Sequence, residues 1–250
     1  MKYAGLDIGS RTIALVVVDD SGVVEASVQD TTYDPIAECR RLLADRDFDG
    51  MVATGYGRHL AAEHFGARPI TEIKAFATGA SNLNPGCRGV LDIGGQDVKV
   101  IALDERGRVT DFEMNDRCAA GTGKFIEVMA TALGYPVEDF GDSALRSTSL
   151  VKVNSTCTVF AESEVVSLIA KGEPRDNIAY GIHDAIAGRI ISMVNRVGLT
   201  GGIFFAGGAA RNRALQAILA EKLDTVLFVP DNPQIVGALG AALTGLAAAV

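Results

Sequence analysis

Leu6-Asp7-Ile8-Gly9 opens a stretch, residues 6–24, that realigns without a gap with residues 91–109, which open with Leu91-Asp92-Ile93-Gly94. In both copies an apolar segment leads into the Asp-Ile-Gly turn, and a second apolar segment and a glycine-centred hairpin follow. Each copy therefore predicts a strand, a turn and a second strand. Two such units, each presenting an acidic residue and backbone amides, suggest two facing loops around one ligand. A polyphosphate that carries a metal ion is the candidate ligand.

The turn explains why these residue types suit that ligand. Glycine has no Cβ, so Gly9, Gly94 and Gly95 can take positive φ and direct successive N–H groups into one concavity for anionic oxygens. Asp7 and Asp92 would hold Mg²⁺ through water, because hard carboxylates suit a hydrated magnesium ion. The other candidate ligand contacts in the two turns are Ser10, Arg11, Thr12, Gln96 and Asp97. The alternative is two β-hairpins whose Asp-Gly units only make turns, but duplication in register favours the ligand site.

A third glycine element lies in Phe204-Phe205-Ala206-Gly207-Gly208-Ala209-Ala210-Arg211-Asn212. This pattern predicts an apolar strand, two glycines and a helix N-terminus, which lets a flat ring or a phosphate approach the backbone. Taken alone, this signal is weak, and an ordinary strand-to-helix turn explains it better. Beside the duplicated loops it becomes the expected adenosine site, with Gly207, Gly208, Ala209 and Asn212 as the candidate residues.

The composition limits the classes of partner and compartment. A formal net charge of −8 over 250 residues, without a basic patch, argues against a nucleic-acid-binding surface. The start, MKYAGLDIG, lacks the pattern of a signal peptide, and the Ala/Gly-rich segment Gly237–Val250 is shorter than a bilayer span requires. We therefore expect a cytoplasmic protein without a membrane segment. Its four cysteines are then not expected to form structural disulfides.

Strands alternate with helices along the chain, which indicates α/β layers. We expect strands near 2–29, 50–53, 88–114, 202–206 and 225–229, and helices near 34–45, 71–83, 122–133, 158–171, 174–197, 210–222 and from 237 onward. Each half then has three strands followed by helix, strand and helix. We expect two domains, residues 1–86 with 231–250 and residues 87–230, with the ligand in the cleft between them and the terminal helix packed on the first domain.

Two of the cysteines lie in similar settings. Cys118 stands in Met114-Asn115-Asp116-Arg117-Cys118-Ala119-Ala120-Gly121-Thr122-Gly123-Lys124-Phe125, and Cys157 follows Ser155 and Thr156, which are capping candidates for the next helix. Both thiols are thus expected near helix N-termini, where the partial positive charge lowers a thiol pKa. Cys39 and Cys87 lack such a setting and receive no role.

Three interpretations of Cys118 and Cys157 stay open from spacing alone. Each can be a small buried residue at a helix start. Alternatively, a two-fold symmetric dimer would bring four thiolates together, as an iron–sulfur cubane requires. Zinc would suit the same four thiolates.

Several motifs together resemble a known family. They are GLDIGS at 5–10, TGYGR at 54–58, DIGGQDVKV at 92–100, MNDRCAAGTGKF at 114–125, STCTVFAESEV at 155–165, GGAARN at 207–212 and GALGAAL at 237–243. The chain resembles the ATPase activators of 2-hydroxyacyl-CoA dehydratases, the ATPase subunits of benzoyl-CoA reductases and the reductases of double-cubane proteins. By the same resemblance the fold is expected to be that of the actin, sugar-kinase and heat-shock ATPase superfamily.

The resemblance implies a homodimeric, air-sensitive ATPase of anaerobic metabolism that binds ATP or ADP with Mg²⁺. One 4Fe-4S cluster would lie between the subunits, held by Cys118 and Cys157 of each. Reduced ferredoxin or flavodoxin would supply electrons, and ATP would drive one electron onward to an iron–sulfur dehydratase or reductase. Two rival functions remain: a small-metabolite kinase of the same superfamily, which leaves both cysteines unexplained, and a zinc-bridged dimeric nucleotide-binding module.

The expected mechanism couples the second loop to the cluster. The turn Gly121-Thr122-Gly123 and Cys118 follow one hairpin after Asp92, so a movement that tracks the γ-phosphate can move a helix beside the cluster. Asp7, Asp92 and Gln96 are candidates for catalysing hydrolysis, with none singled out as the general base. Lys124 and Glu162 are candidates for contacting nucleotide, or are solvated charges on helix surfaces.

Overall fold

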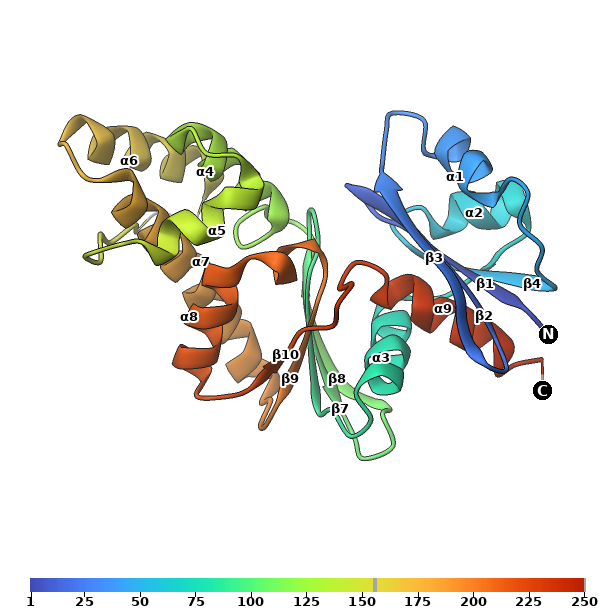
Figure 1. The fold of residues 1–250 in the computed structure, drawn as a ribbon. Coiled ribbons are helices and arrows are strands. Elements are labelled where there is room, and N and C mark those ends of the chain that lie inside the picture. The colour runs from blue at the N-terminus through green and yellow to red at the C-terminus, as the bar shows by residue number, and fades with distance from the viewer. Residues whose placement is uncertain (155–156, 250) are drawn as a thin grey trace. The chain divides into compact units, whose positions relative to one another are not determined.

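Two five-stranded sheets with flanking helices make up the computed structural model, which describes residues 1–154 and 157–249. The first sheet has the order β3-β2-β1-β4-β5 and the second the order β10-β9-β6-β7-β8 (Figure 1). The strands are β1 (Tyr3–Ile8), β2 (Thr12–Asp19), β3 (Gly22–Asp30), β4 (Gly50–Gly55), β5 (Arg68–Pro69), β6 (Gly89–Ile93), β7 (Val98–Leu103), β8 (Val109–Asn115), β9 (Ile203–Ala206) and β10 (Leu227–Phe228).

The helices that the structure describes cover these sheets or extend from them. They are α1 (Pro35–Leu43), α2 (Arg58–Phe65), α3 (Glu72–Leu83), α4 (Gly123–Leu133), α5 (Val137–Leu145), α6 (Thr158–Ala170), α7 (Arg175–Val197), α8 (Arg213–Leu223) and α9 (Val236–Leu246), with a 3₁₀ turn η1 (Gly208–Arg211). Ser155 and Thr156, the predicted caps of α6, lie outside the described residues.

The two sheets repeat one topology. Reversed, the second order becomes β8-β7-β6-β9-β10, which matches β3-β2-β1-β4-β5 strand for strand. The turns match as well: the Gly9 N–H donates to the Thr12 carbonyl and the Gly94 N–H to the Asp97 carbonyl, both at 3.0 Å. The duplication predicted from the sequence is therefore confirmed in the geometry of the backbone.

The hairpins after the second strand of each copy also correspond. The Oδ1 atom of Asp19 accepts the N–H of Ser21, and that of Asp104 accepts the N–H of Arg106, both at 2.8 Å. Hydrogen bonds to each carboxylate hold the pKa of Asp19 and of Asp104 below the usual range. The carboxylates of Asp19 and Asp104 therefore stabilise the hairpin turns by accepting backbone N–H groups.

β2 shows how the first sheet is buried on both faces. Successive side chains of a strand point to opposite faces, and here Ile13, Leu15 and Val17 pack with one buried cluster while Ala14 and Val16 pack with another. The first cluster includes residues of α1 and α2, and the second includes residues of α9. The near-continuous apolar run Ile13–Val18 follows from this double burial.

α9 returns the C-terminal part of the chain to the first sheet, beside β1 and β2 (Figure 1). Its approach requires residues without side chains: a Cβ on Gly5 would lie 1.9 Å from the Ala238 carbonyl oxygen, and one on Gly240 would lie 1.8 Å from the Ala75 carbonyl oxygen. The Ala/Gly composition that predicted a buried terminal helix is thus explained by close backbone packing against β1 and α3.

Contacts divide the chain into two compact units. Unit 1 comprises Met1–Val90, Ile101–Phe112 and Val229–Val250, and unit 2 comprises Leu91–Val100 and Glu113–Phe228. The two-domain division expected from the sequence stays a prediction.

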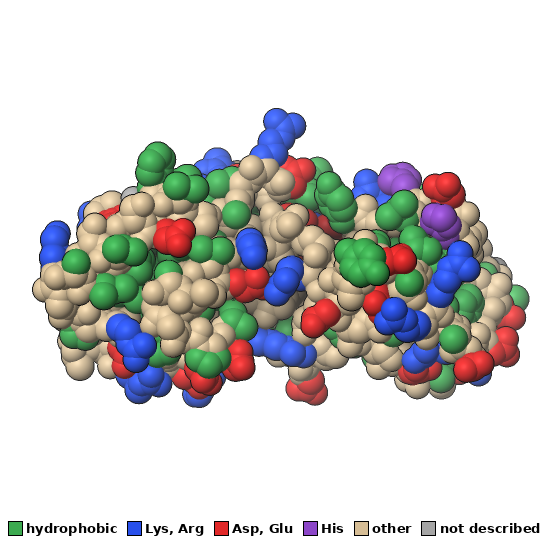
Figure 2. Space-filling model, turned by 90° about the horizontal axis from the view of Figure 1, so that it is seen from above, with side chains coloured by type: hydrophobic (Ala, Val, Ile, Leu, Met, Phe, Trp, Pro, Cys, Tyr) green, Lys and Arg blue, Asp and Glu red, His purple; other side chains and the backbone are tan. Residues whose placement is uncertain are grey.

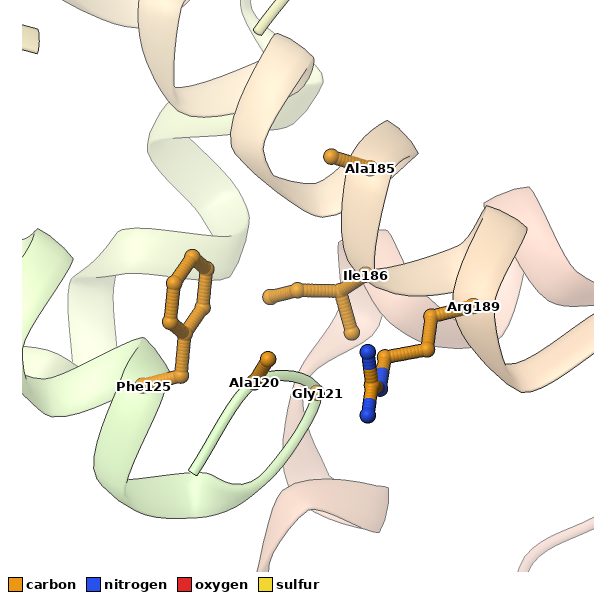
Figure 3. A pocket seen from close by; sticks show the side chains of 6 residues that line it. All are labelled: Ala120, Gly121, Phe125, Ala185, Ile186 and Arg189. Atoms are coloured by element: carbon orange, nitrogen blue, oxygen red, sulfur yellow. The ribbon is translucent and has the colours of Figure 1, made fainter. Parts of the chain in front are cut away.

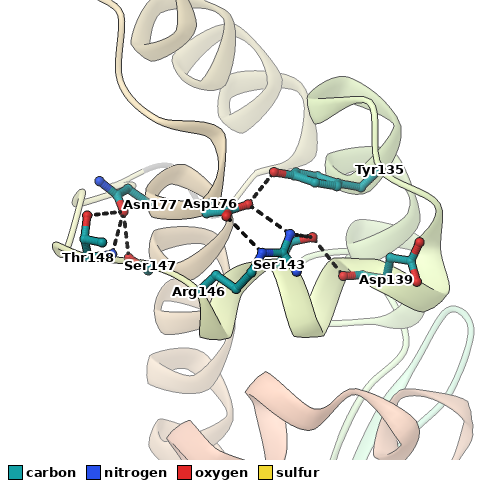
Figure 4. A network of polar contacts seen from close by, with 8 residues as sticks. All are labelled: Tyr135, Asp139, Ser143, Arg146, Ser147, Thr148, Asp176 and Asn177. Atoms are coloured by element: carbon teal, nitrogen blue, oxygen red, sulfur yellow. Dashed lines mark hydrogen bonds and ion pairs between the residues drawn. The ribbon is translucent and has the colours of Figure 1, made fainter.

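A polar network joins the helices of unit 2. Asp176, at the start of α7, accepts hydrogen bonds from Tyr135 and Arg146 on either side of α5 (Figure 4). Asn177 accepts the Thr148 N–H at 2.9 Å in the following loop. The network fixes both ends of α5 against α7, so the helical part of unit 2 is held by directional contacts as well as by apolar packing.

Two helices were missed by the sequence analysis. α2 buries only Ala61 among its side chains, and α5 has just nine residues. α2 lacks the repeated apolar stripe by which a helix is detected. α5 has Val137, Phe140 and Ala144 at helical spacing, a signal that the sequence analysis did not use. The other expected helices and strands are present, with ends shifted by a few residues, as is usual for element boundaries.

The surface mixes charges of both signs. Lys and Arg side chains lie among Asp and Glu side chains on the face seen in Figure 2. Of the described helices, none combines the length and the apolar character that crossing a bilayer requires.

Packing of α9 gives a first prediction. Gly240→Ala should destabilise the protein by about 1–3 kcal/mol, because its new methyl group overlaps the backbone of α3. Gly188→Ala is the matched control, since a Cβ at this exposed helical position meets nothing within 4 Å. It should stabilise the fold by about 0.5–1 kcal/mol through helix propensity. Urea unfolding followed by circular dichroism measures both; equal effects would contradict the packing of α9.

Candidate functional site

The first predicted loop lies at the end of β1 in unit 1. Its turn is closed by the Gly9 N–H, and its carbonyl groups are bound by a residue that follows β3: the Thr31 hydroxyl donates to the Gly9 carbonyl at 2.9 Å, and the Thr31 N–H donates to the Arg11 carbonyl at 2.8 Å. The second loop, between β6 and β7, closes the same way through the Gly94 N–H. The amides of Gly9 and Gly94 are therefore used inside the turns.

The expectation of positive φ in these turns is wrong. Gly9, Gly94 and Gly95 do not have positive φ. Glycine is needed here because there is no room for a side chain. A Cβ on Gly94 would lie 2.4 Å from Asp97 Oδ1, and one on Gly9 would lie 2.9 Å from the Thr12 carbonyl oxygen. The turns are thus too tight for a side chain, whatever their backbone conformation.

Positive φ occurs at two other equivalent positions. Gly55 ends β4 and Gly207 follows β9, and both have φ of 83°. A Cβ on Gly55 would lie 2.3 Å from Asp7 Oδ1, and one on Gly207 would lie 2.5 Å from Asp92 Oδ1. Each predicted carboxylate therefore packs against a glycine of the neighbouring strand. The third glycine element, proposed for adenosine, is the counterpart of the Gly55 turn.

Asp7 is further confined by α9. A Cβ on Gly237 would lie 2.2 Å from Asp7 Oδ2, so the carboxylate lies between the Gly55 turn and the start of the terminal helix. This position, at the carboxyl end of a strand, is where ligands of open α/β sheets bind.

Lys99 is the residue that the sequence analysis missed in the second loop. Its ammonium lies 3.0 Å from Asp92 Oδ2 and 2.8 Å from Asp97 Oδ2, and its side chain is 2% exposed. Removing one partner of such a buried ion pair typically costs about 3–5 kcal/mol. A signal was available: Lys99 is the single charged residue within the apolar strand Val98–Leu103, and the matching residue of the first copy is Ala14.

The second loop is bonded directly to α4. The N–H groups of Gly123 and Lys124 donate to the carbonyl oxygens of Gly94 and Gly95, both at 2.9 Å. The preceding turn is closed by Thr122, whose buried hydroxyl donates to the Ala119 carbonyl at 2.6 Å. The loop and the N-terminus of α4 therefore form one hydrogen-bonded body within unit 2.

The remaining predicted residues near this helix differ in exposure. Gly121 has φ of 88° and lies in the turn before α4, where the Arg189 side chain of α7 points toward it (Figure 3). Ala120, Gly121, Phe125, Ala185, Ile186 and Arg189 line a small pocket there. Lys124 is exposed and pairs with Glu127 at 3.6 Å, and Glu162 is exposed on α6. Both placements suit the alternative of surface charges, and nucleotide contact stays a prediction.

The four cysteines fall into two pairs by burial. Cys157 is exposed as the N-cap residue of α6, and Cys118 is partly exposed in the segment between β8 and α4, where the Asn115 side-chain amide donates to its carbonyl. Cys39 and Cys87 are buried. Burial raises the pKa of Cys39 to about 11 and also raises the pKa of Cys87. The two cysteines predicted as metal ligands are thus the accessible pair, and both belong to unit 2.

Asn212 has a structural task. Its Oδ1 caps α8 by accepting the Leu215 N–H at 3.0 Å, and its amide nitrogen lies 2.9 Å from His183 Nε2. His183 Nδ1 lies 2.7 Å from the Ala179 carbonyl, which fits a neutral ring protonated on Nδ1. Both ends of the Asn212 side chain are therefore engaged within unit 2, and contact of this residue with a nucleotide stays a prediction.

Comparison with known proteins places the chain among related ATPases. The sequence matches the BadF/BadG/BcrA/BcrD ATPase family over residues 4–245. It is 40% identical to the 2-hydroxyisocaproyl-CoA dehydratase activator of Clostridioides difficile, over 97% of this chain and 94% of the relative. It is 35% identical to one of the subunits of benzoyl-CoA reductase from Thauera aromatica, over 80% of this chain and 72% of the relative.

Solved structures agree with this placement. The activator of the 2-hydroxyisocaproyl-CoA dehydratase from Clostridium difficile with bound ADPNP superposes with a TM-score of 0.92 at 38% identity, covering 100% of this chain and 96% of that one. A ROK family glucokinase of Streptomyces griseus, at 11% identity, has a TM-score of 0.61 over 98% of this chain and 99% of that one. The predicted actin-like and sugar-kinase-like fold class is confirmed.

The difference in burial predicts how the thiols react. In metal-free native protein, a disulfide reagent should modify Cys118 and Cys157 rapidly and leave Cys39 and Cys87 unmodified, because their sulfurs are buried and their thiolates disfavoured. Denaturant should expose all four. Spectrophotometric titration with peptide mapping measures this, and a Cys118→Ser/Cys157→Ser variant should show no fast phase. Rapid modification of Cys39 would contradict the structure.

The burial of His183 predicts an acid-sensitive stability. Burial lowers the pKa of His183 to about 4 from the ordinary value of 6.5, so between these pH values the unfolded chain binds a proton that the folded chain does not. Stability should therefore fall as the pH drops through this window, by about 3 kcal/mol in all. His183→Gln should remove this contribution from the pH dependence of urea unfolding. His64→Gln, at an exposed position, should leave it unchanged; the reverse pattern would contradict the assignment.

Proposed function

The chain belongs to the BadF/BadG/BcrA/BcrD ATPase family, and from this membership and the site geometry we propose that it is an ATP-driven, one-electron activator of a partner iron–sulfur enzyme. In this proposal the active form is a homodimer with one 4Fe-4S cluster held by Cys118 and Cys157 of both subunits. The observation that carries the proposal is that these two accessible cysteines lie in the unit whose second loop is bonded to the helix after Cys118.

The nucleotide part of the proposal rests on the duplicated loops. Asp7 and Asp92 stand at matching positions beside glycines, where a Mg²⁺-bound phosphate can approach the backbone. The relative solved with ADPNP supports an adenine nucleotide as the ligand. We propose that Asp7, Asp92 and Gln96 act in hydrolysis. The residues that we propose for nucleotide binding are Gly9 to Thr12, Gly94, Gly95, Asp97, Gly121 to Lys124, Glu162, Gly207 to Ala209 and Asn212.

The donor set suits an iron–sulfur cluster shared between subunits. Among the described residues no three or more His, Cys, Asp or Glu side chains converge as a metal site. A cubane takes four thiolates, so the two accessible thiols of one chain meet half of that requirement and a second copy of the chain meets the rest. When bound, the cluster would supply a one-electron redox centre.

The residues of this chain would then couple nucleotide to cluster. A change in the Gly94–Asp97 turn on binding or hydrolysis is passed to α4 through the bonds from Gly123 and Lys124. Because the Cys118 segment leads directly into α4, movement of this helix start would alter the surroundings of its sulfur. A nucleotide can drive such a change only through different affinities for the two conformations.

The partners follow from the relatives. One is named an activator of a dehydratase, and another is a component of benzoyl-CoA reductase. We propose that this chain likewise passes an electron to an iron–sulfur dehydratase or reductase in the cytoplasm, and receives it from ferredoxin or flavodoxin.

The proposal is tested by metal content. Protein purified without oxygen should be brown and contain about four irons per dimer. Cys118→Ala and Cys157→Ala should each lose the iron and the visible absorbance, while Cys39→Ala, a change at a buried thiol, should retain both. A colourless, zinc-containing dimer, or full iron in either of the first two variants, would contradict the proposal.

A further inference from the structure

The buried ammonium of Lys99 carries an inference about how the second loop works. We propose that Lys99 is a positioning residue: by binding Asp92 and Asp97 together, it holds the Gly94–Asp97 turn in the shape that fixes the N-terminus of α4, and so passes the nucleotide state to the Cys118 segment. The inference rests on the proposed function, because it assumes that the loop binds a nucleotide.

The contacts of Lys99 cross the turn. Asp92 lies before the turn, in β6, and Asp97 is the last residue of the turn. The ammonium lies 3.0 Å and 2.8 Å from their Oδ2 atoms and so ties the two sides of the turn together. The other oxygen of Asp97 lies against Gly94, since a Cβ there would be 2.4 Å away. With two carboxylates and one ammonium the group has a net negative charge, and the 2% exposure of the Lys99 side chain leaves little screening by water.

The first copy shows that this ion group is not needed to form the turn. There Ala14 replaces Lys99 and Thr12 replaces Asp97, yet the turn closes with the same 3.0 Å hydrogen bond. A buried charge cluster is costly to form. Its presence in the second copy alone therefore points to a task that the first copy does not have.

The two copies differ in which residues donate hydrogen bonds to the carbonyl groups of the loop. In the first copy the Gly9 carbonyl accepts from the side chain of Thr31. In the second copy the matching carbonyl, that of Gly94, accepts from the first residue of α4, and the Gly95 carbonyl accepts from the next. The cluster of Lys99 with Asp92 and Asp97 thus occurs in the copy whose loop is hydrogen-bonded to α4, the helix that follows Cys118. In this proposal it stiffens the turn that joins the second loop to α4.

The test measures the coupling directly and does not need the cluster. In metal-free protein, the alkylation rate of Cys118 is followed by mass spectrometry with and without saturating MgADP, and MgADP binding is measured by calorimetry. In the unaltered chain, MgADP should change the rate by about 5-fold or more, the range of ordinary coupling between sites. Lys99→Met should bind MgADP more weakly and show no change in rate at saturation.

Two further variants separate positioning from folding. Lys99→Met/Asp97→Asn also removes one of the two neighbouring carboxylates, so its melting temperature should lie above that of Lys99→Met. It should stay below that of the unaltered chain, because Asp92 is left buried without its ammonium, and the response of Cys118 should stay absent. Lys222→Met is the control for loss of a lysine, because Lys222 forms a pair with Asp184 at the surface of unit 2, with its side chain 39% exposed. It should respond as the unaltered chain does.

The outcomes distinguish this inference from the proposed function. A normal response in Lys99→Met, or its return in the double variant, would overturn the role of Lys99 while leaving the ATPase proposal intact. The same holds if the unaltered chain binds MgADP without any change at Cys118. Absence of MgADP binding by the unaltered chain would overturn both.

Discussion

A carboxylate packed against a glycine, at the carboxyl end of the central strand of each sheet, is the contact on which both candidate loops depend. Asp7 meets Gly55 and Asp92 meets Gly207 at distances that no Cβ would permit, and both glycines have the same positive φ. Because the neighbouring strand turns away at this glycine, the carboxylate and the backbone beside it come close together. This geometry occurs twice in the chain, and it is where the proposed function puts the phosphate and its metal ion.

Divergence between the two copies carries more information than their likeness. The first copy ties its loop to Thr31 and is lined by Ala14, whereas the second ties its loop to α4 and buries Lys99 between two aspartates. Both make the same turn, so the difference lies in what each loop holds. The carbonyl groups of the first loop accept hydrogen bonds from a residue that follows β3, whereas those of the second loop accept them from the start of a helix.

Burial sorts the cysteines into two pairs. Cys39 and Cys87 pack as small apolar groups, and burial makes their thiolates unfavourable. Cys118 and Cys157 keep access to solvent, and each precedes a helix of unit 2. Cys118 precedes α4, which is hydrogen-bonded to the second loop, and Cys157 is the N-cap residue of α6, which packs against α4.

The sequence by itself determined the duplicated strand-turn-strand units, the buried Ala/Gly-rich terminal helix and the distinct settings of Cys118 and Cys157, because apolar periodicity, glycine content and short motifs are local properties. Only the tertiary structure decided which glycines approach the carboxylates, that Lys99 bridges Asp92 and Asp97, and that the side chain of Asn212 is used by α8 and His183. α2 was also missed, since it buries too few apolar residues to show a helical period. The reason is the same in each case: strand register and helix packing bring together residues that lie far apart along the chain, and no local pattern records those contacts.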